Sequence, residues 1–143
     1  MRKDKVRHLS LKKVILFTLI IMMLGTVLEL YLINHYETAL QLIPILCIGS
    51  LMLILIILFF IRTKLIRVIF KVILVISALS GFYGVYLHLV ANYEFEIEMT
   101  PTANNWDLFS ESLSGALPAL APFSMIILAL IGYSYLKLIN QKQ

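Results

Sequence analysis

Three side chains of this sequence have the chemistry of metal ligands and fall where helical geometry can bring them together. Glu29 lies near the end of one apolar run, and His88 lies near the end of another. Glu96 follows His88 by eight residues, which keeps it on the same face of a continuous helix. Because imidazole and carboxylate groups bind zinc, iron and manganese, Glu29, His88 and Glu96 are the first candidate ligands if this chain binds a divalent metal.

Further polar side chains fall near the same ends of the apolar runs and form a second tier of ligand candidates. They are His35, Glu37, Gln41, Asn92 and Glu94. The spacing contains no compact motif such as His-Glu-x-x-His, so a Glu29–His88 pair that only holds helices together is a competing interpretation. Another alternative is a b-type haem with His35 and His88 as its axial ligands.

The composition places these groups in a membrane protein. Of the 143 residues, 61% are hydrophobic and 14% are charged, and the mean hydropathy is +0.95. Soluble domains are about half apolar and about a quarter charged, so these values exclude a soluble globule, a disordered chain and a coiled coil. A span takes about 20 residues, so four spans leave no room for a soluble catalytic domain.

Four apolar runs are long enough to cross a bilayer as helices. They cover residues 14–33, 40–61, 68–90 and 116–136, and an acidic loop at 91–115 separates the last two. Short turns join the first three runs, which favours antiparallel neighbours. We therefore expect an all-α integral membrane protein in which residues 1–143 form a single domain. Its fold is expected to be an antiparallel four-helix transmembrane bundle with a short interfacial segment between the third and fourth spans.

The charges predict how this bundle is oriented. All 12 lysines and arginines lie within residues 1–13, 62–71 and 137–142, whereas Asp4 is the only one of the 8 acidic residues found there. By the positive-inside rule, both termini and the turn at 62–67 are cytoplasmic and the acidic loop faces outward. The basic residues flank the membrane and lack a recognition fold, so we expect contact with anionic lipid and no nucleic-acid binding.

The segment 93–99 alternates apolar and acidic residues, and two interpretations of it remain open. An extended segment has this period of two and aligns Glu94, Glu96 and Glu98 on one face. Continuation of the third helix instead aligns Glu96 with His88.

Small residues predict which face of the third span lies inside the bundle. Ser77, Gly81 and Gly84 precede His88 at spacings of four, three and four. Helices in membranes approach most closely along such residues, so we expect this face, and His88 with it, to point inward.

Two prolines and one aspartate predict local breaks near the acidic loop. We expect Pro118 at the start of the fourth helix and Pro122 to kink that helix and free backbone carbonyls. Asp107 is the expected N-cap of a short interfacial helix that Trp106 anchors and that ends near Gly115.

The sequence gives no support for nucleophilic catalysis. It has no nucleophile elbow and no Walker-type loop, and its single cysteine, Cys47, can form no intramolecular disulfide. We expect an accessory or scaffold subunit with a polar outward-facing site, with a metal-dependent protein and a haem protein as alternatives. The expected location is a bacterial inner membrane, in contact with lipid and with a partner membrane protein or a second copy of the chain.

Overall fold

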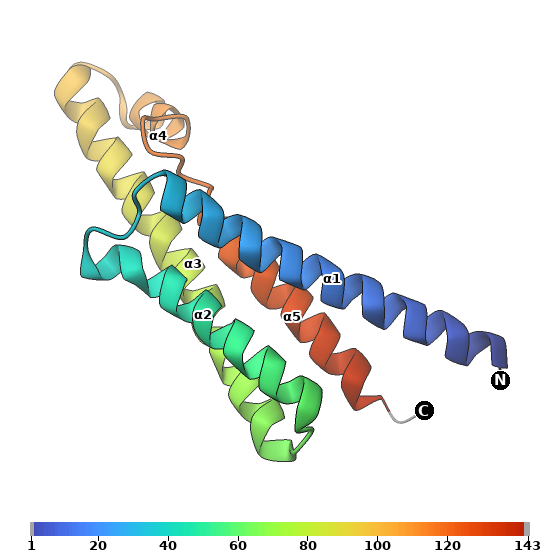
Figure 1. Ribbon diagram of the computed structural model, residues 1–143. Coiled ribbons are helices and arrows are strands. Elements are labelled where there is room, and N and C mark those ends of the chain that lie inside the picture. The colour runs from blue at the N-terminus through green and yellow to red at the C-terminus, as the bar shows by residue number, and fades with distance from the viewer. Residues whose placement is uncertain (1, 142–143) are drawn as a thin grey trace.

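The computed structural model describes residues 2–141, and side chains from Ser10 onward. Within this range the chain forms five helices and no strand (Figure 1). They are α1 (Arg2–Leu32), α2 (Ala39–Phe60), α3 (Lys64–Met99), α4 (Asn105–Leu113) and α5 (Phe123–Asn140). Four segments are long and apolar enough to cross a membrane: Ser10–Leu32, Ala39–Phe60, Lys64–Met99 and Phe123–Asn140. The predicted all-α chain with four such helices is confirmed.

Short polar side chains fix where the helices begin. Thr38 caps α2 in a capping box, because its hydroxyl accepts the Gln41 N–H while the Gln41 side chain accepts the N–H of Thr38. Thr63 caps α3 by accepting the N–H of Ile66. These caps satisfy amide donors that have no partner inside their helices.

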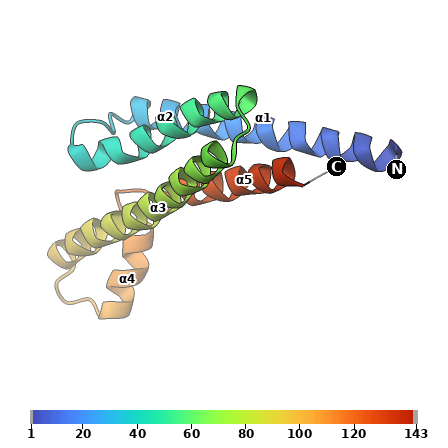
Figure 2. The same cartoon turned by 90° about the horizontal axis from the view of Figure 1, so that it is seen from below.

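The longest helix, α3, connects the other elements. It packs against α2, α4 and α5, while α1 packs against α5 and α2. The beginning of α1 and the end of α5 lie on the same side of the molecule in both views (Figures 1 and 2). The short helix α4 lies beside the last turns of α3, far from both of these ends.

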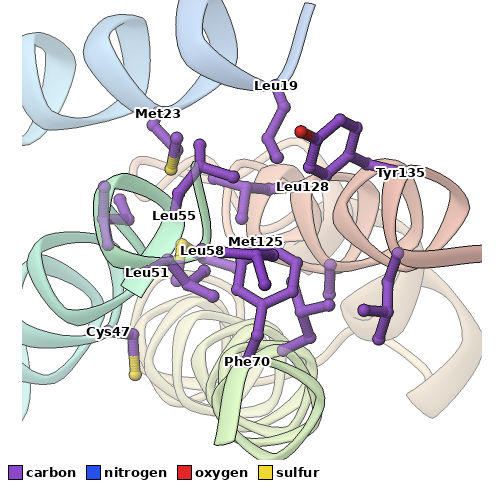
Figure 3. Close-up of a cluster of buried hydrophobic side chains, with 14 residues drawn as sticks. Leu19, Met23, Cys47, Leu51, Leu55, Leu58, Phe70, Met125, Leu128 and Tyr135 are labelled. Atoms are coloured by element: carbon purple, nitrogen blue, oxygen red, sulfur yellow. The ribbon is translucent and has the colours of Figure 1, made fainter. Parts of the chain in front are cut away.

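The core forms where α1, α2, α3 and α5 meet. Figure 3 shows its side chains converging from the four helices, with Leu19 on α1, Leu51 on α2, Phe70 on α3 and Leu128 on α5. These four side chains are at most 1% exposed. The outward faces are also apolar, and Phe60 is 77% exposed. Apolar side chains thus cover both the inside and the outside of the described helices, which soluble monomers rarely show.

The small-residue face of α3 packs inward, as predicted. Ser77 and Gly81 are buried, and a Cβ added at Gly81 would lie 2.9 Å from the carbonyl oxygen of Pro122 and 2.9 Å from a side-chain carbon of Ile126. Glycine therefore lets α3 and the start of α5 approach more closely than any other residue allows.

The fourth apolar helix begins later than the expected residue 116. It starts at Phe123 with Pro122 at its N-cap, so Pro118 lies outside the helix and Pro122 precedes its first turn rather than kinking it. The reason is that proline has no N–H to donate to a carbonyl four residues earlier, and its ring clashes with that carbonyl. Residues 114–122 therefore form a non-helical linker.

The expected acidic loop at 91–115 is mostly helical. Helix α3 continues to Met99, so of the two interpretations of segment 93–99 the helical one is correct. Asn104, not Asp107, caps α4, because its side chain accepts the N–H groups of Trp106 and Asp107. Asp107 is the third residue of α4, and its carboxylate accepts a hydrogen bond from the side-chain amide of Asn104 at 2.7 Å.

Candidate functional site

The described part of the molecule contains a cavity of about 200 Å³, which we call the histidine pocket. It lies between α1, α2, α3 and the segment that leads into α5. Its polar lining includes Glu29, His35, Gln41, Ser80, Tyr83 and His88. Its apolar lining includes Leu30, Ile43, Leu87, Pro122 and Met125. The cavity therefore combines a mainly apolar wall with a few groups that can form hydrogen bonds, as small-molecule sites do.

His88 is oriented by a hydrogen bond that depends on the proline pair. Its Nδ1 lies 3.1 Å from the carbonyl oxygen of Pro118. In a regular helix that oxygen would accept the N–H of residue 122, but Pro122 has none. The Pro118 oxygen accepts instead from His88 and, at 3.0 Å, from the N–H of Ala121. Because a carbonyl oxygen can only accept, Nδ1 of His88 carries the proton.

His35 reaches the pocket from the tight turn after α1. Asn34 adopts a left-handed conformation with φ of 55°, and the N–H of His35 donates to the Leu30 carbonyl at 2.8 Å. This turn places the His35 ring edge-on to that of His88, with 6.3 Å between the ring centroids. Burial, followed by the charge of His88, lowers the pKa of His35. Its neutral form is therefore favoured.

Gln41 and Glu37 take part in the hydrogen bonds of the turn that precedes α2, and they do not form a cluster of metal ligands. The Gln41 side-chain oxygen accepts the N–H groups of Glu37 and Thr38 at 2.9 and 3.0 Å. That oxygen is thus committed to the cap of α2, although the Gln41 side chain also lines the pocket. The Glu37 side chain is exposed.

Asn92 holds the linker that carries Pro118. The side chain is 2% exposed, and its amide nitrogen donates to the carbonyls of Ser112 and Leu117 at 2.9 and 2.7 Å. Its amide oxygen accepts the N–H of Leu117 at 2.9 Å. Gly115 permits this contact, because a Cβ there would lie 2.6 Å from Cγ of Asn92. Asn92 is a structural residue that indirectly places the partner of His88.

The structure brings together only part of the predicted metal set. Glu29 and His88 line the same pocket, but Glu94 and Glu96 do not. Glu96 lies two turns beyond His88 on α3, about 12 Å along the helix axis. Within the described residues, no group of three or more His, Cys, Asp or Glu side chains is arranged to hold a metal ion. Metal binding by Glu29, His88 and Glu96 stays a prediction.

A haem does not fit this pocket. An engineered cavity of about 150 Å³ accommodates a single benzene ring, and the histidine pocket is only modestly larger. A four-pyrrole macrocycle between His35 and His88 would require the helices to separate. The residues present therefore do not support the b-type haem alternative.

Sequence reasoning missed Ser80 and Tyr83 as lining residues. Ser80, Gly84 and His88 follow one another at intervals of four, so the signal was present in the helical periodicity. The expected kink at Pro122 predicts freed carbonyls, but not that a histidine from another helix donates to one of them.

Comparisons with known protein families, with curated proteins and with solved structures found no match. The function proposed for this chain therefore depends on its own residues and geometry.

Proposed function

We propose that this chain is a small multi-pass membrane protein that binds an amphiphilic molecule in the histidine pocket and serves as an accessory subunit. The observation that carries the proposal is the pocket itself, whose apolar wall meets imidazole, amide and carboxylate groups. An amphiphile offers the matching chemistry, because its chain is compatible with the wall and its head group can form hydrogen bonds.

The proposal places four apolar helices across a bilayer as an antiparallel bundle. The large number of exposed apolar side chains supports this placement. The distribution of lysine and arginine supports cytoplasmic termini and an outward-facing pocket end. A bacterial inner membrane is the proposed location.

Cysteine labelling tests this orientation. Asn104→Cys and Thr63→Cys are introduced separately into a Cys47→Ala background, and intact cells receive a thiol reagent that cannot cross the membrane. Asn104 and Thr63 are both exposed, so access to the reagent depends on the side of the membrane. We expect labelling of the cysteine at 104 and protection of the one at 63. The reverse pattern would overturn the orientation.

The pocket size limits the part of the ligand that enters it. A volume of about 200 Å³ admits a head group of about one ring. It is too small to enclose a whole lipid, so most of the chain must lie along the apolar exterior of the helices. This geometry fits a protein that takes its ligand from the surrounding bilayer.

Photolabelling tests ligand binding directly. The probe is decanol with a diazirine close to its hydroxyl group, so that the photoreactive carbon enters the pocket with the head. It is added to the protein in detergent micelles, and the labelled residues are mapped by mass spectrometry. We expect labelling concentrated at lining residues such as Leu30, Ile43 and Leu87. Ser80→Leu should reduce it, because the larger side chain occupies part of the cavity.

Ser50→Leu is the matched control for this experiment. Ser50 is an exposed helix residue outside the pocket, so the same substitution there should leave the labelling pattern unchanged. Labelling spread evenly over the exposed apolar faces, and unaffected by Ser80→Leu, would refute the proposed binding function.

Metal binding is the second candidate, favoured by one observation. The hydrogen bond from Nδ1 of His88 to a backbone carbonyl is the arrangement that orients histidines bound to metals. Elemental analysis of the purified protein by mass spectrometry, native and His88→Ala in parallel and without chelators, tests it. Near-stoichiometric metal that is lost in the variant would support this candidate, whereas no metal in either protein would exclude it.

A further inference from the structure

The two ring nitrogens of His88 have different roles. Nδ1 donates to the Pro118 carbonyl, so the neutral imidazole carries its free lone pair on Nε2. Among the described residues Nε2 has no hydrogen-bond partner, and the His88 ring lines the histidine pocket. The pocket therefore presents an acceptor whose tautomer is fixed by the proline pair rather than by the ligand.

The charge of the lining disfavours one class of head group. Glu29 lines the pocket, and no lysine or arginine whose side chain the structure describes does. Neighbouring His35 favours its neutral form, so it does not supply a compensating positive charge. A carboxylate or phosphate head group would meet the Glu29 charge without a cationic partner. A neutral head group avoids this repulsion.

We propose that the histidine pocket selects amphiphiles with a neutral hydroxyl-bearing head no larger than one ring, and that Nε2 of His88 accepts the hydroxyl hydrogen. This inference rests on the proposed function, because it names the ligand class of the same pocket. The hydroxyl supplies the donor that Nε2 lacks, and a phenol-sized head matches the volume.

Two competing ligands test whether the hydroxyl hydrogen is needed for binding. 4-Decylphenol and 4-decylanisole have the same ring and chain, but the anisole has a methyl ether in place of the O–H group. Each competes with the diazirine decanol probe for the native protein, at equal mole fractions in the micelle. We expect the phenol to compete about tenfold more strongly, because the ether leaves Nε2 without a donor. Ionised decanoate, the anionic competitor, should compete least.

The outcomes separate this inference from the proposed function. If the decanol probe does not label the lining residues specifically, the proposed function fails. If it labels them but neither ring compound displaces it, the pocket binds amphiphiles but the inference of a one-ring hydroxyl head is wrong. If the phenol and the anisole compete equally, or if decanoate competes as well as the phenol, the pocket binds amphiphiles but the selection of a neutral hydroxyl is wrong. These comparisons use the native protein, so they do not depend on the folding of a variant.

Two variants then assign the acceptor. His88→Phe keeps a ring but removes both nitrogens, and it should bind the phenol and the anisole equally. His35→Phe keeps His88 and should retain the preference for the phenol. Loss of the preference in His35→Phe but not in His88→Phe would overturn the assignment of the acceptor to His88.

Discussion

Replacing Asn92 tests whether one buried amide holds the linker beside the histidine pocket. The amide makes three hydrogen bonds to the backbone of Ser112 and Leu117, at 2.7 to 2.9 Å, and is 2% exposed. Asn92→Leu keeps a similar volume but removes all three bonds. At about 1 kcal/mol of net stability for each bond, we expect a loss of about 3 kcal/mol in the free energy of unfolding.

The reactivity of the single cysteine, Cys47, measures unfolding. Cys47 is buried at 7% exposure, so a fluorogenic thiol reagent should react with it only when the helices separate. For a chain of this size about 1 kcal/mol corresponds to about 2 to 4 °C, so Asn92→Leu should lower the melting temperature by about 6 to 12 °C. Binding of 4-decylphenol should also weaken, because Pro118 is no longer held beside His88.

Asn105→Leu is the control for the loss of an asparagine. Asn105 is exposed, lies at the first position of α4 and caps nothing. Its replacement should leave the melting temperature within a few degrees of the native value. A native-like melting temperature for Asn92→Leu would show that the linker is held by other contacts, and the reasoning about Asn92 would be refuted.

Three other predictions use the same melting assay. Gly81→Ala should lower the free energy of unfolding by about 1 to 3 kcal/mol, because the added Cβ would lie 2.9 Å from a backbone oxygen. Gly25→Ala should cause no loss of stability, because nothing lies within 4 Å of a Cβ added there. Equal effects of the two substitutions would contradict the close approach of α3 and α5. Thr38→Ala should cost about 1 kcal/mol by removing the capping box of α2, and an unchanged melting temperature would contradict this role. Burial lowers the pKa of His35 from 6.5, so as the pH falls below that value the unfolded chain takes up a proton before the folded chain does, and stability should fall. His35→Gln should reduce the fall in stability between pH 7 and pH 5. A pH profile identical to that of the native protein would contradict the role of His35 in this fall.

The proline pair has a functional consequence for the histidine pocket. Because Pro122 is the N-cap, the helix begins about one turn after Pro118, and the Pro118 carbonyl fixes the tautomer of His88. A regular helix through residues 116–136 would use that carbonyl internally. The pocket acceptor thus depends on a local break in a helix, which is consistent with the general finding that irregular backbone near a membrane lines a polar site.

Much of the secondary structure follows from the sequence. Runs of apolar residues are long enough to determine four helices without any knowledge of their neighbours, because a helix satisfies its backbone groups within its own segment except at its two ends. The inward face of α3 was also predictable, since Ser77 and Gly81 lie on one helical stripe. The start of the fourth apolar helix was harder to predict, because apolar residues continue through the linker while the prolines prevent a helix there.

The ligand candidates show where the sequence stops being sufficient. Spacing placed Glu96 and His88 on one face of α3, yet a common face does not place two side chains 12 Å apart in one pocket. Spacing also could not show that Asn92 is buried against a linker 20 to 25 residues away.

Composition and periodicity by themselves determined that this chain forms apolar helices and which residues lie near their polar ends, because these properties follow from short-range backbone geometry and from hydropathy. Only the tertiary structure decided that His35, His88 and Glu29 share a cavity and that Pro118 orients His88. The His35–His88 ring contact and the His88–Pro118 hydrogen bond join residues 53 and 30 positions apart. They depend on how the helices pack against one another, which no local pattern in the sequence specifies.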